Sequence, residues 1–306
     1  MNTFEKARKF IYRNARPLDL ARWEFYFENG DANDVLTALS SYQNHDGGFG
    51  HGLEPDCFNP NSSPIQTWAA TEILRQIGFT DCSHPVIQGI LRYLGSGADF
   101  DKAHNQWRNA VATNNDFPHA IWWEFKDGED EFTYNPTACL AGFALCYADK
   151  ASALYKKARE IAVQAYGAFA AKVPFDEAHI TACYIRLFDY CARAGITELF
   201  DMELFRVQLI EQVTHTICAD TEKWGKEYVT LPSRLIDSPK SIFYAGNEEL
   251  AAAECDFLMQ NQLADGSYTV PWQWWTDYKE FELAANWWKS DIIVNNMRFL
   301  QGFGKV

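Results

Sequence analysis

The sequence predicts an all-α protein, an (α/α)6 toroid: a barrel of six inner and six outer helices with long loops at one end. Apolar residues recur at helical spacing through most of the 306 residues. One helix of each expected pair starts at Pro or at a short polar cap, and long irregular loops precede these starts. No Pro/Ser-rich linker or change of composition divides the chain. We therefore expect a single toroid domain over residues 1–306.

Twelve helices in six pairs are expected, and their ends carry recognisable signals. Pro17 and Pro64 suit a first helical position, where the missing N–H would have no partner in any case. Ser63 is the expected N-cap before Pro64, and Gly78 is the expected stop. The expected helices cover 4–14, 17–28, 34–42, 64–78, 85–95, 135–148, 151–171, 176–195, 203–218, 238–246, 248–260 and 290–299. One helix of each pair starts, in order, at Pro17, Pro64, Pro136, around Asp176, at Pro239 and at Ser290.

The composition limits the classes of partner. Hydrophobic residues make up 47% of the chain and aromatic residues 15%. These can fill a large helical core and can also line a pocket for an apolar ligand or a sugar ring. The formal net charge is −14, and no basic run is present. A nucleic-acid partner and an anionic membrane surface are therefore not expected.

The eight cysteines indicate the compartment. None forms a CxxC pair, and most lie in apolar helical patterns such as residues 137–148. Buried free thiols in a reducing compartment fit this pattern, so a cytoplasmic protein is expected. The first 17 residues show neither a long apolar core nor a small-residue cleavage site. No segment approaches the ~18 uninterrupted apolar residues of a membrane span.

Two segments, QNHDGGFG and QNQLADGSYTVPWQW, resemble the repeat loop of the terpenoid cyclases and protein prenyltransferases. In that superfamily an outer helix ends in Gln and is followed by an Asp-Gly-aromatic turn. The pattern here covers Gln43–Phe49 and Gln260–Tyr268. The resemblance implies an α/α toroid with a central cavity that holds a small-molecule ligand.

The sequence departs from the chemistry of those families. The stretch before Pro64, residues 59–63, lacks the Asp-rich run of the cyclases that protonate their substrates. Ser267 stands where a prenyltransferase has its zinc-binding Cys, and a hydroxyl is a poor replacement for a thiolate. No metal and no cofactor are expected.

The loop after Gln43 supplies the first candidate catalytic residues: His51, Glu54 and Asp56. Loops that lead into inner helices surround the mouth of a helix barrel. Two carboxylates and a His there can divide acid and base roles if burial separates their pKa values. The alternative is that these groups cap turns and bind backbone. Asn61, in the same loop, is a candidate ligand-binding residue.

Two further segments carry candidates. In FPHAIWWEF, His119 is a candidate catalytic residue, and Trp122 and Trp123 are a candidate stacking platform for a ring. In a helical segment all three would share a face. His179 is a candidate catalytic residue in the first turn of FDEAHITACY. The remaining ligand-binding candidates are chosen by position alone: Tyr134, Asp176, Arg234, Trp272 and Trp288.

These residues support an enzyme with a central aromatic, acidic cavity that performs acid/base chemistry on an isoprenoid-like or small carbohydrate ligand. Two alternatives stay open: a non-catalytic toroid that binds a ligand or a protein, and a carbohydrate-active enzyme of glycosidase or lyase type. A phosphate-binding loop at GGFGHG is rejected, because no Lys-Ser/Thr follows it. The sequence leaves the oligomeric state open.

Overall fold

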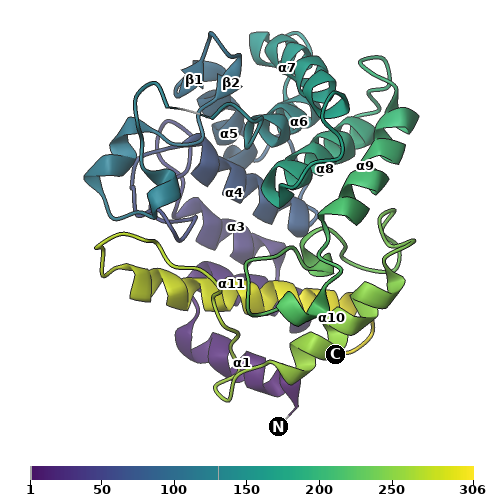
Figure 1. Cartoon of the computed structure of the whole chain (residues 1–306). Helices are drawn as coiled ribbons and strands as arrows, with labels where there is room; N and C mark the ends of the chain where they lie inside the picture. Colours follow the sequence, from purple (N-terminus) through teal and green to yellow (C-terminus); the bar gives the residue numbers. More distant parts are fainter. Residues whose placement is uncertain (1, 130) are drawn as a thin grey trace. The chain divides into compact units, whose positions relative to one another are not determined.

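The computed structural model describes residues 2–129 and 131–306, and this part of the chain is mainly helical (Figure 1). It contains eleven α-helices and one two-stranded sheet. The helices are α1 (Thr3–Asn14), α2 (Pro17–Phe27), α3 (Ala32–Ser40), α4 (Pro64–Gln76), α5 (Pro85–Ser96), α6 (Thr137–Tyr147), α7 (Ala153–Ala170), α8 (Ala178–Arg193), α9 (Met202–Thr216), α10 (Glu248–Gln260) and α11 (Phe281–Gly302). Strands β1 (Phe100–Asp101) and β2 (Gln106–Trp107) pair in an antiparallel register. The prediction of a helical protein is confirmed.

The backbone groups into two compact units. Unit 1 comprises Met1–Ala38 with Val213–Val306, and unit 2 comprises Leu39–Gln212. The chain passes from one unit to the other within α3 and within α9. The single toroid domain stays a prediction.

Helix α6 forms the centre of unit 2. It is apolar on every side and buried from Thr137 to Leu145, which is typical of a helix surrounded by others. It packs against α8 and α7, and more lightly against α4 and α5. Helix α4 begins as expected: Ser63 Oγ accepts the N–H of Gln66, and Pro64 takes the first helical position.

Unit 1 is built on α11, which packs against α1 and α2. Its core joins Ile11 of α1, Trp23 of α2, Cys255 of α10 and Met297 of α11. Tyr268, from the second Asp-Gly turn, belongs to the same core.

Two helix predictions are wrong, and the expected twelve helices are eleven in the described residues. Residues 238–246 form successive turns, in which Tyr244 N–H donates to the carbonyl of Ser241, instead of a helix. Helix α11 begins at Phe281, not at Ser290. Its early start follows from the helix-forming Glu, Leu and Ala that come directly after Phe281, where no Pro or polar cap marks the beginning of the helix.

No helix in the described residues is long and apolar enough to cross a membrane. All eight cysteines are free thiols.

Candidate functional site

The loop between α3 and α4 begins with a turn that Gln43 holds closed. Its side-chain amide donates to the carbonyl of Gly47 at 2.9 Å and to that of Val86, in α5, at 3.0 Å. Asp46 Oδ1 accepts the N–H of Gly48 and the hydroxyl of Ser62. The carboxylate of Asp46 therefore shapes the loop, as is usual for Asp in an Asp-Gly turn.

His51 belongs to this turn region. Its Nε2 lies 2.9 Å from Oδ1 of Asn44, its ring is exposed, and its backbone is left-handed at φ +60°. Asn61 is exposed too, and its side-chain amide donates to Oδ1 of Asn59. Solvent therefore reaches the side chains of His51 and Asn61, whereas Glu54 and Asp56, the other candidate residues of the loop, are buried.

Glu54 and Asp56 are buried, with 7% and 3% of their surface exposed. Glu54 Oε2 accepts the N–H of Asp56 at 2.9 Å and the indole N–H of Trp123 at 3.1 Å. The N–H of Glu54 donates to Gln66, whose own amide donates to the carbonyl of Cys57. These bonds give Glu54 a defined role in holding the loop against α4.

The structure brings the first two groups of predicted residues together. The segment of Cys57 forms a β-bridge with His119, and Ala120 N–H donates to the carbonyl of Asp56 at 2.8 Å. His119 is buried, and its Nδ1 lies 2.6 Å from the carbonyl oxygen of Phe117. In a neutral ring this contact places the proton on Nδ1 and makes Nε2 the acceptor.

The two tryptophans of this segment have different environments. Trp122 is 40% exposed, whereas Trp123 is 8% exposed and bound to Glu54. Only the short 3-10 helix η2 (Ile121–Trp123) forms there, so His119 does not share a helix face with them. Tyr134 is partly buried just before α6, and burial raises its pKa.

The remaining candidates lie elsewhere. Asp176 and His179 are exposed at the start of α8, where the N–H of His179 donates to the capping side chain of Glu177. Arg234, Trp272 and Trp288 belong to unit 1. Trp272 and Trp288 meet edge to face, with ring centroids 5.2 Å apart, and Arg234 is exposed.

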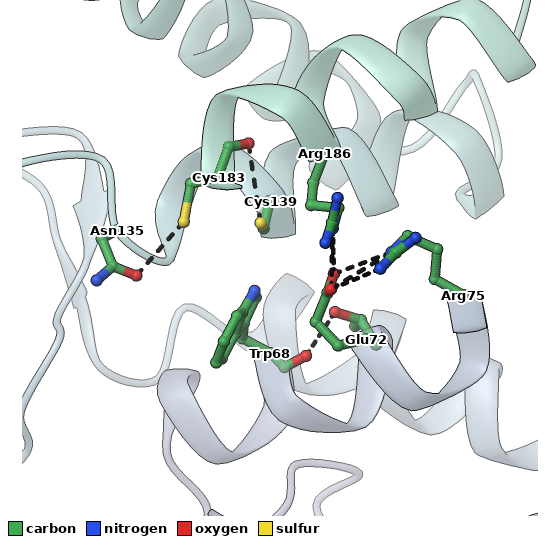
Figure 2. Close-up of polar contacts among 8 residues, drawn as sticks. Trp68, Glu72, Arg75, Asn135, Cys139, Cys183 and Arg186 are labelled. Carbon is green, nitrogen blue, oxygen red and sulfur yellow. Dashed lines mark hydrogen bonds and ion pairs between the residues drawn. The ribbon is translucent and has the colours of Figure 1, made fainter. Parts of the chain in front are cut away.

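A second polar cluster of unit 2 contains none of the residues predicted from the sequence. It lies on the helices α4 and α8 (Figure 2), where Glu72 is bound by two guanidinium groups. Nε of Arg186 lies 3.0 and 2.8 Å from the two oxygens of Glu72. Arg75 adds contacts at 3.3 Å from Nε and at 3.0 Å from Nη2. All three side chains are mostly buried, with 14% of Glu72, 21% of Arg75 and 16% of Arg186 exposed.

The two carboxyl groups of this cluster differ in acidity. Burial acts to raise the pKa of Glu72, but Arg186 and Arg75 outweigh it and lower that pKa to about 2. Asp189 lies one turn after Arg186 on α8, and burial raises its pKa although both guanidiniums act in the opposite direction. Within residues 2–129 and 131–306, the carboxyl group of Asp189 makes no hydrogen bond.

Trp68 precedes Glu72 by one turn and lies on the same face of α4. Figure 2 shows its indole directed into the space between α4 and the helices that carry Cys139 and Cys183. The indole nitrogen is buried without a hydrogen-bond partner in the described chain. Cys183 instead donates to Oδ1 of Asn135, and Cys139 to the carbonyl of Cys183. A buried N–H without a partner is costly, and a water molecule or a ligand that accepts its hydrogen bond removes that cost.

A sequence signal for this cluster existed. Trp68, Glu72 and Arg75 lie on one face of α4 at i, i+4 and i+7, and Arg186 and Asp189 lie on one face of α8 at i and i+3. Polar groups that share a helix face need a partner on the neighbouring helix, because buried charges are paired. The residues predicted from the sequence lie mainly in loops and at helix starts, so they do not include these residues inside helices.

The described side chains include no group of three His, Cys, Asp or Glu that could hold a metal ion. Ser267 is buried and donates its hydroxyl to Asp265 at 2.7 Å. No family model, no curated protein and no solved structure matches this chain.

Proposed function

We propose that this chain is an (α/α)6 toroid enzyme that binds a small hydroxylated molecule of saccharide type and acts on it by acid–base catalysis. The observation that carries the proposal is the polar face of α4 and α8, whose hydrogen-bonding groups are only partly used within the described chain. It combines the carboxyl of Asp189, which has no hydrogen-bond partner in the described residues, with the buried, unpartnered indole N–H of Trp68. The same face carries the ion cluster of Glu72.

The helix packing of unit 2 supports the toroid part of this proposal. Inner helices of an α/α toroid run parallel to one another, with outer helices returning between them. The contact of Glu72 with Arg186, together with the electrostatic influence of Arg75 on Asp189, fits α4 and α8 running in the same direction. In this arrangement α4, α6 and α8 are inner helices, and α5, α7 and α9 are outer helices.

Each residue of the polar face has a role in the proposed reaction. Asp189, whose raised pKa lets it keep a proton to higher pH than an ordinary Asp, is the acid and base. Trp68 offers an aromatic face and an N–H donor to a sugar ring. Glu72 is a positioning residue that orients Arg75 and Arg186. From Trp68 to Arg75 the face spans about 10 Å of helix, enough for one or two sugar rings.

The buried charges weigh against an isoprenoid ligand, because an apolar chain against them would leave guanidinium and carboxyl groups desolvated. Glu54, Asp56 and His119 have a positioning role in this proposal, since the loop they hold leads directly into α4.

The experiment that tests the proposal starts from the full chain. A panel of mono- and disaccharides and an isoprenoid diphosphate are compared for binding by calorimetry, and bound compounds are then tested for turnover. We expect a saccharide to bind and to be converted, and Asp189→Asn to reduce kcat by ~10²–10⁴. Asp201→Asn serves as the matched control, because Asp201 is an exposed Asp outside this face.

Two results would refute the proposal. One is binding of the isoprenoid diphosphate with no saccharide bound, and the other is full turnover by a folded Asp189→Asn variant.

A further inference from the structure

The polar face of α4 and α8 contains more hydrogen-bond donors than the protein itself uses. Arg186 binds Glu72 through Nε alone, and its two terminal nitrogens have no partner in the part of the chain that the structure describes. Arg75 uses Nε and Nη2 on Glu72 and leaves Nη1 without one. The indole N–H of Trp68 is a further donor without a partner.

Acceptors on this face are scarce by comparison. Glu72 takes hydrogen bonds from both guanidiniums with both of its oxygens, as Figure 2 shows. Asp189 is the remaining carboxyl group, and its pKa is raised, so its ionised form is disfavoured. Guanidinium groups keep their protons in a protein. The terminal nitrogens of Arg186, a side chain that is 16% exposed, can therefore donate to a ligand that reaches them.

The charges around Glu72 also favour the binding of an anion. Two guanidinium groups share the carboxylate of Glu72, and the ionised form of Asp189, the other carboxyl group that interacts with both of them, is disfavoured by burial. The whole chain, in contrast, has a formal net charge of −14. Two guanidinium groups gathered at one place in an acidic protein attract an anionic ligand to that place, and their partial burial strengthens the attraction.

The guanidiniums are also held in place before any ligand binds. Both Arg side chains are fixed on Glu72, so little side-chain entropy remains to be lost on binding. The planar terminal nitrogens of Arg186 match the geometry of two acceptor oxygens on one group, as in a carboxylate or a phosphate.

We propose that the ligand of this face carries an anionic group, a carboxylate or a phosphate, which the terminal nitrogens of Arg186 bind with the help of Arg75. The inference rests on the proposed function only for the saccharide part of the ligand. The substrate class is then an acidic sugar, either a uronic acid or a sugar phosphate. Trp68 binds the ring, and Asp189 faces the hydroxylated portion.

The test measures binding to the full chain by isothermal titration calorimetry with five probes: glucose, glucuronate, glucose 6-phosphate, acetate and inorganic phosphate. We expect at least one of the two acidic sugars to bind about tenfold or more tightly than glucose, with an affinity that falls as salt rises. Whether glucuronate or glucose 6-phosphate binds more tightly distinguishes a carboxylate from a phosphate.

Variants connect the preference to Arg186. Arg186→Gln removes the preference for the acidic sugar, whereas Arg193→Gln, an exposed Arg on the same helix, keeps it. Arg186→Lys keeps the positive charge beside Glu72, guards against loss of folding, and retains only part of the preference, because Lys lacks the planar fork.

The outcomes separate the two proposals. Glucose binding as tightly as both acidic sugars would overturn the anion site and leave the proposed function standing. Binding of acetate or inorganic phosphate that depends on Arg186, with no sugar bound, would support the anion site and refute the saccharide part of the proposed function. Preference for an acidic sugar that survives unchanged in a folded Arg186→Gln variant would also overturn the anion site.

Discussion

The two Asp-Gly turns, Gln43–Phe49 in unit 2 and residues 262–268 in unit 1, share two backbone hydrogen bonds. Asn44 N–H donates to Gly48 and Gly47 N–H to Asn44, as Leu263 N–H donates to Ser267 and Gly266 N–H to Leu263. Gln262 binds the carbonyl of Gly266 at 3.0 Å and that of Thr3, in α1, at 2.9 Å, as Gln43 binds those of Gly47 and Val86. The matching residue of the second turn is therefore Gln262, two positions after the Gln260 expected from the sequence. In each unit the turn clamps the first turn of a helix.

The turns differ in how the Asp is satisfied. Asp46 receives its second hydrogen bond from Ser62, which lies 16 residues away in the loop. Asp265 receives the same bond from Ser267, two residues away in its own turn. Gly48 stands at the position of Ser267, because a Cβ there would lie 2.6 Å from the Cβ of Ser62.

The two turns therefore differ in whether they depend on the rest of the loop for a hydrogen-bond donor. In unit 2 the hydroxyl that completes the turn is supplied by the loop, so the turn and the loop that carries Glu54 and Asp56 stabilise each other. In unit 1 the turn is complete by itself. Ser267 therefore has a structural role, because its hydroxyl completes the turn.

The largest expected effect comes from the glycine that both turns share. Gly47 and Gly266 have φ +98°, and a Cβ would lie 2.1 Å from the carbonyl oxygen of Gly89 and of Lys6, respectively. Gly47→Ala and Gly266→Ala should each lower the free energy of unfolding by about 3 kcal/mol or more. Urea unfolding measures this loss, with Gly97→Ala as a control for φ alone, since Gly97 has φ +78° and nothing within 4 Å of its Cβ position.

A loss at Gly47 or Gly266 no greater than that at Gly97 would show that the close approach to the helix is unimportant. Equal losses at the two turns would support their equivalence.

The second prediction moves the hydroxyl that binds Asp46 from Ser62 to position 48, which matches Ser267 of the second turn. Gly48→Ser should destabilise unit 2 by about 1–3 kcal/mol, because its Cβ collides with Ser62. The double variant Gly48→Ser/Ser62→Gly should recover part of that loss, since it copies the arrangement of the second turn. Recovery stays partial because a ring atom of Tyr93 also lies 2.8 Å from the new Cβ. Double-mutant analysis of urea unfolding measures the coupling, and strictly additive effects would contradict the comparison.

The third prediction concerns the two Gln clamps. Gln43→Ala and Gln262→Ala each remove two hydrogen bonds to backbone carbonyls and should cost about 1–3 kcal/mol. Gln88→Ala, which removes an exposed amide contact on α5, is the control and should cost less. Thermal unfolding followed by circular dichroism can rank the three. A Gln262→Ala variant as stable as the wild type would mean that the second clamp contributes nothing to unit 1.

The smallest expected effect depends on pH. Burial acts to raise the pKa of Asp265, but the backbone N–H and the hydroxyl of Ser267 outweigh it and lower that pKa. A lowered carboxyl pKa contributes stability above the unfolded value near 4 that is lost as pH falls through the folded value. Asp265→Asn should therefore reduce the acid dependence of unfolding by less than ~1 kcal/mol, since the side chain is exposed. An unchanged pH profile for Asp265→Asn would indicate that Ser267 leaves this carboxylate unaffected.

Local signals in the sequence determined the parts of the fold that depend on neighbours in the chain. Ser63 and Pro64 predict the start of α4, and Gly78 its end, because a cap or a stop acts through atoms within a few residues. The Asp-Gly turns are predictable for the same reason: the bond of Asp46 to Gly48 spans two residues. The helical class of the chain follows from such signals.

Only the tertiary structure decided which distant residues share an environment. Trp123 binds Glu54 across 69 residues, and Arg186 binds Glu72 across 114. Spacing in the sequence cannot reveal such partners, because packing of α4 and α8 in unit 2 sets their distance. The sequence also does not show that donors of Arg186 and Trp68 lack a partner within the described chain. Whether a side chain has a hydrogen-bond partner is decided only when the groups around it are in place.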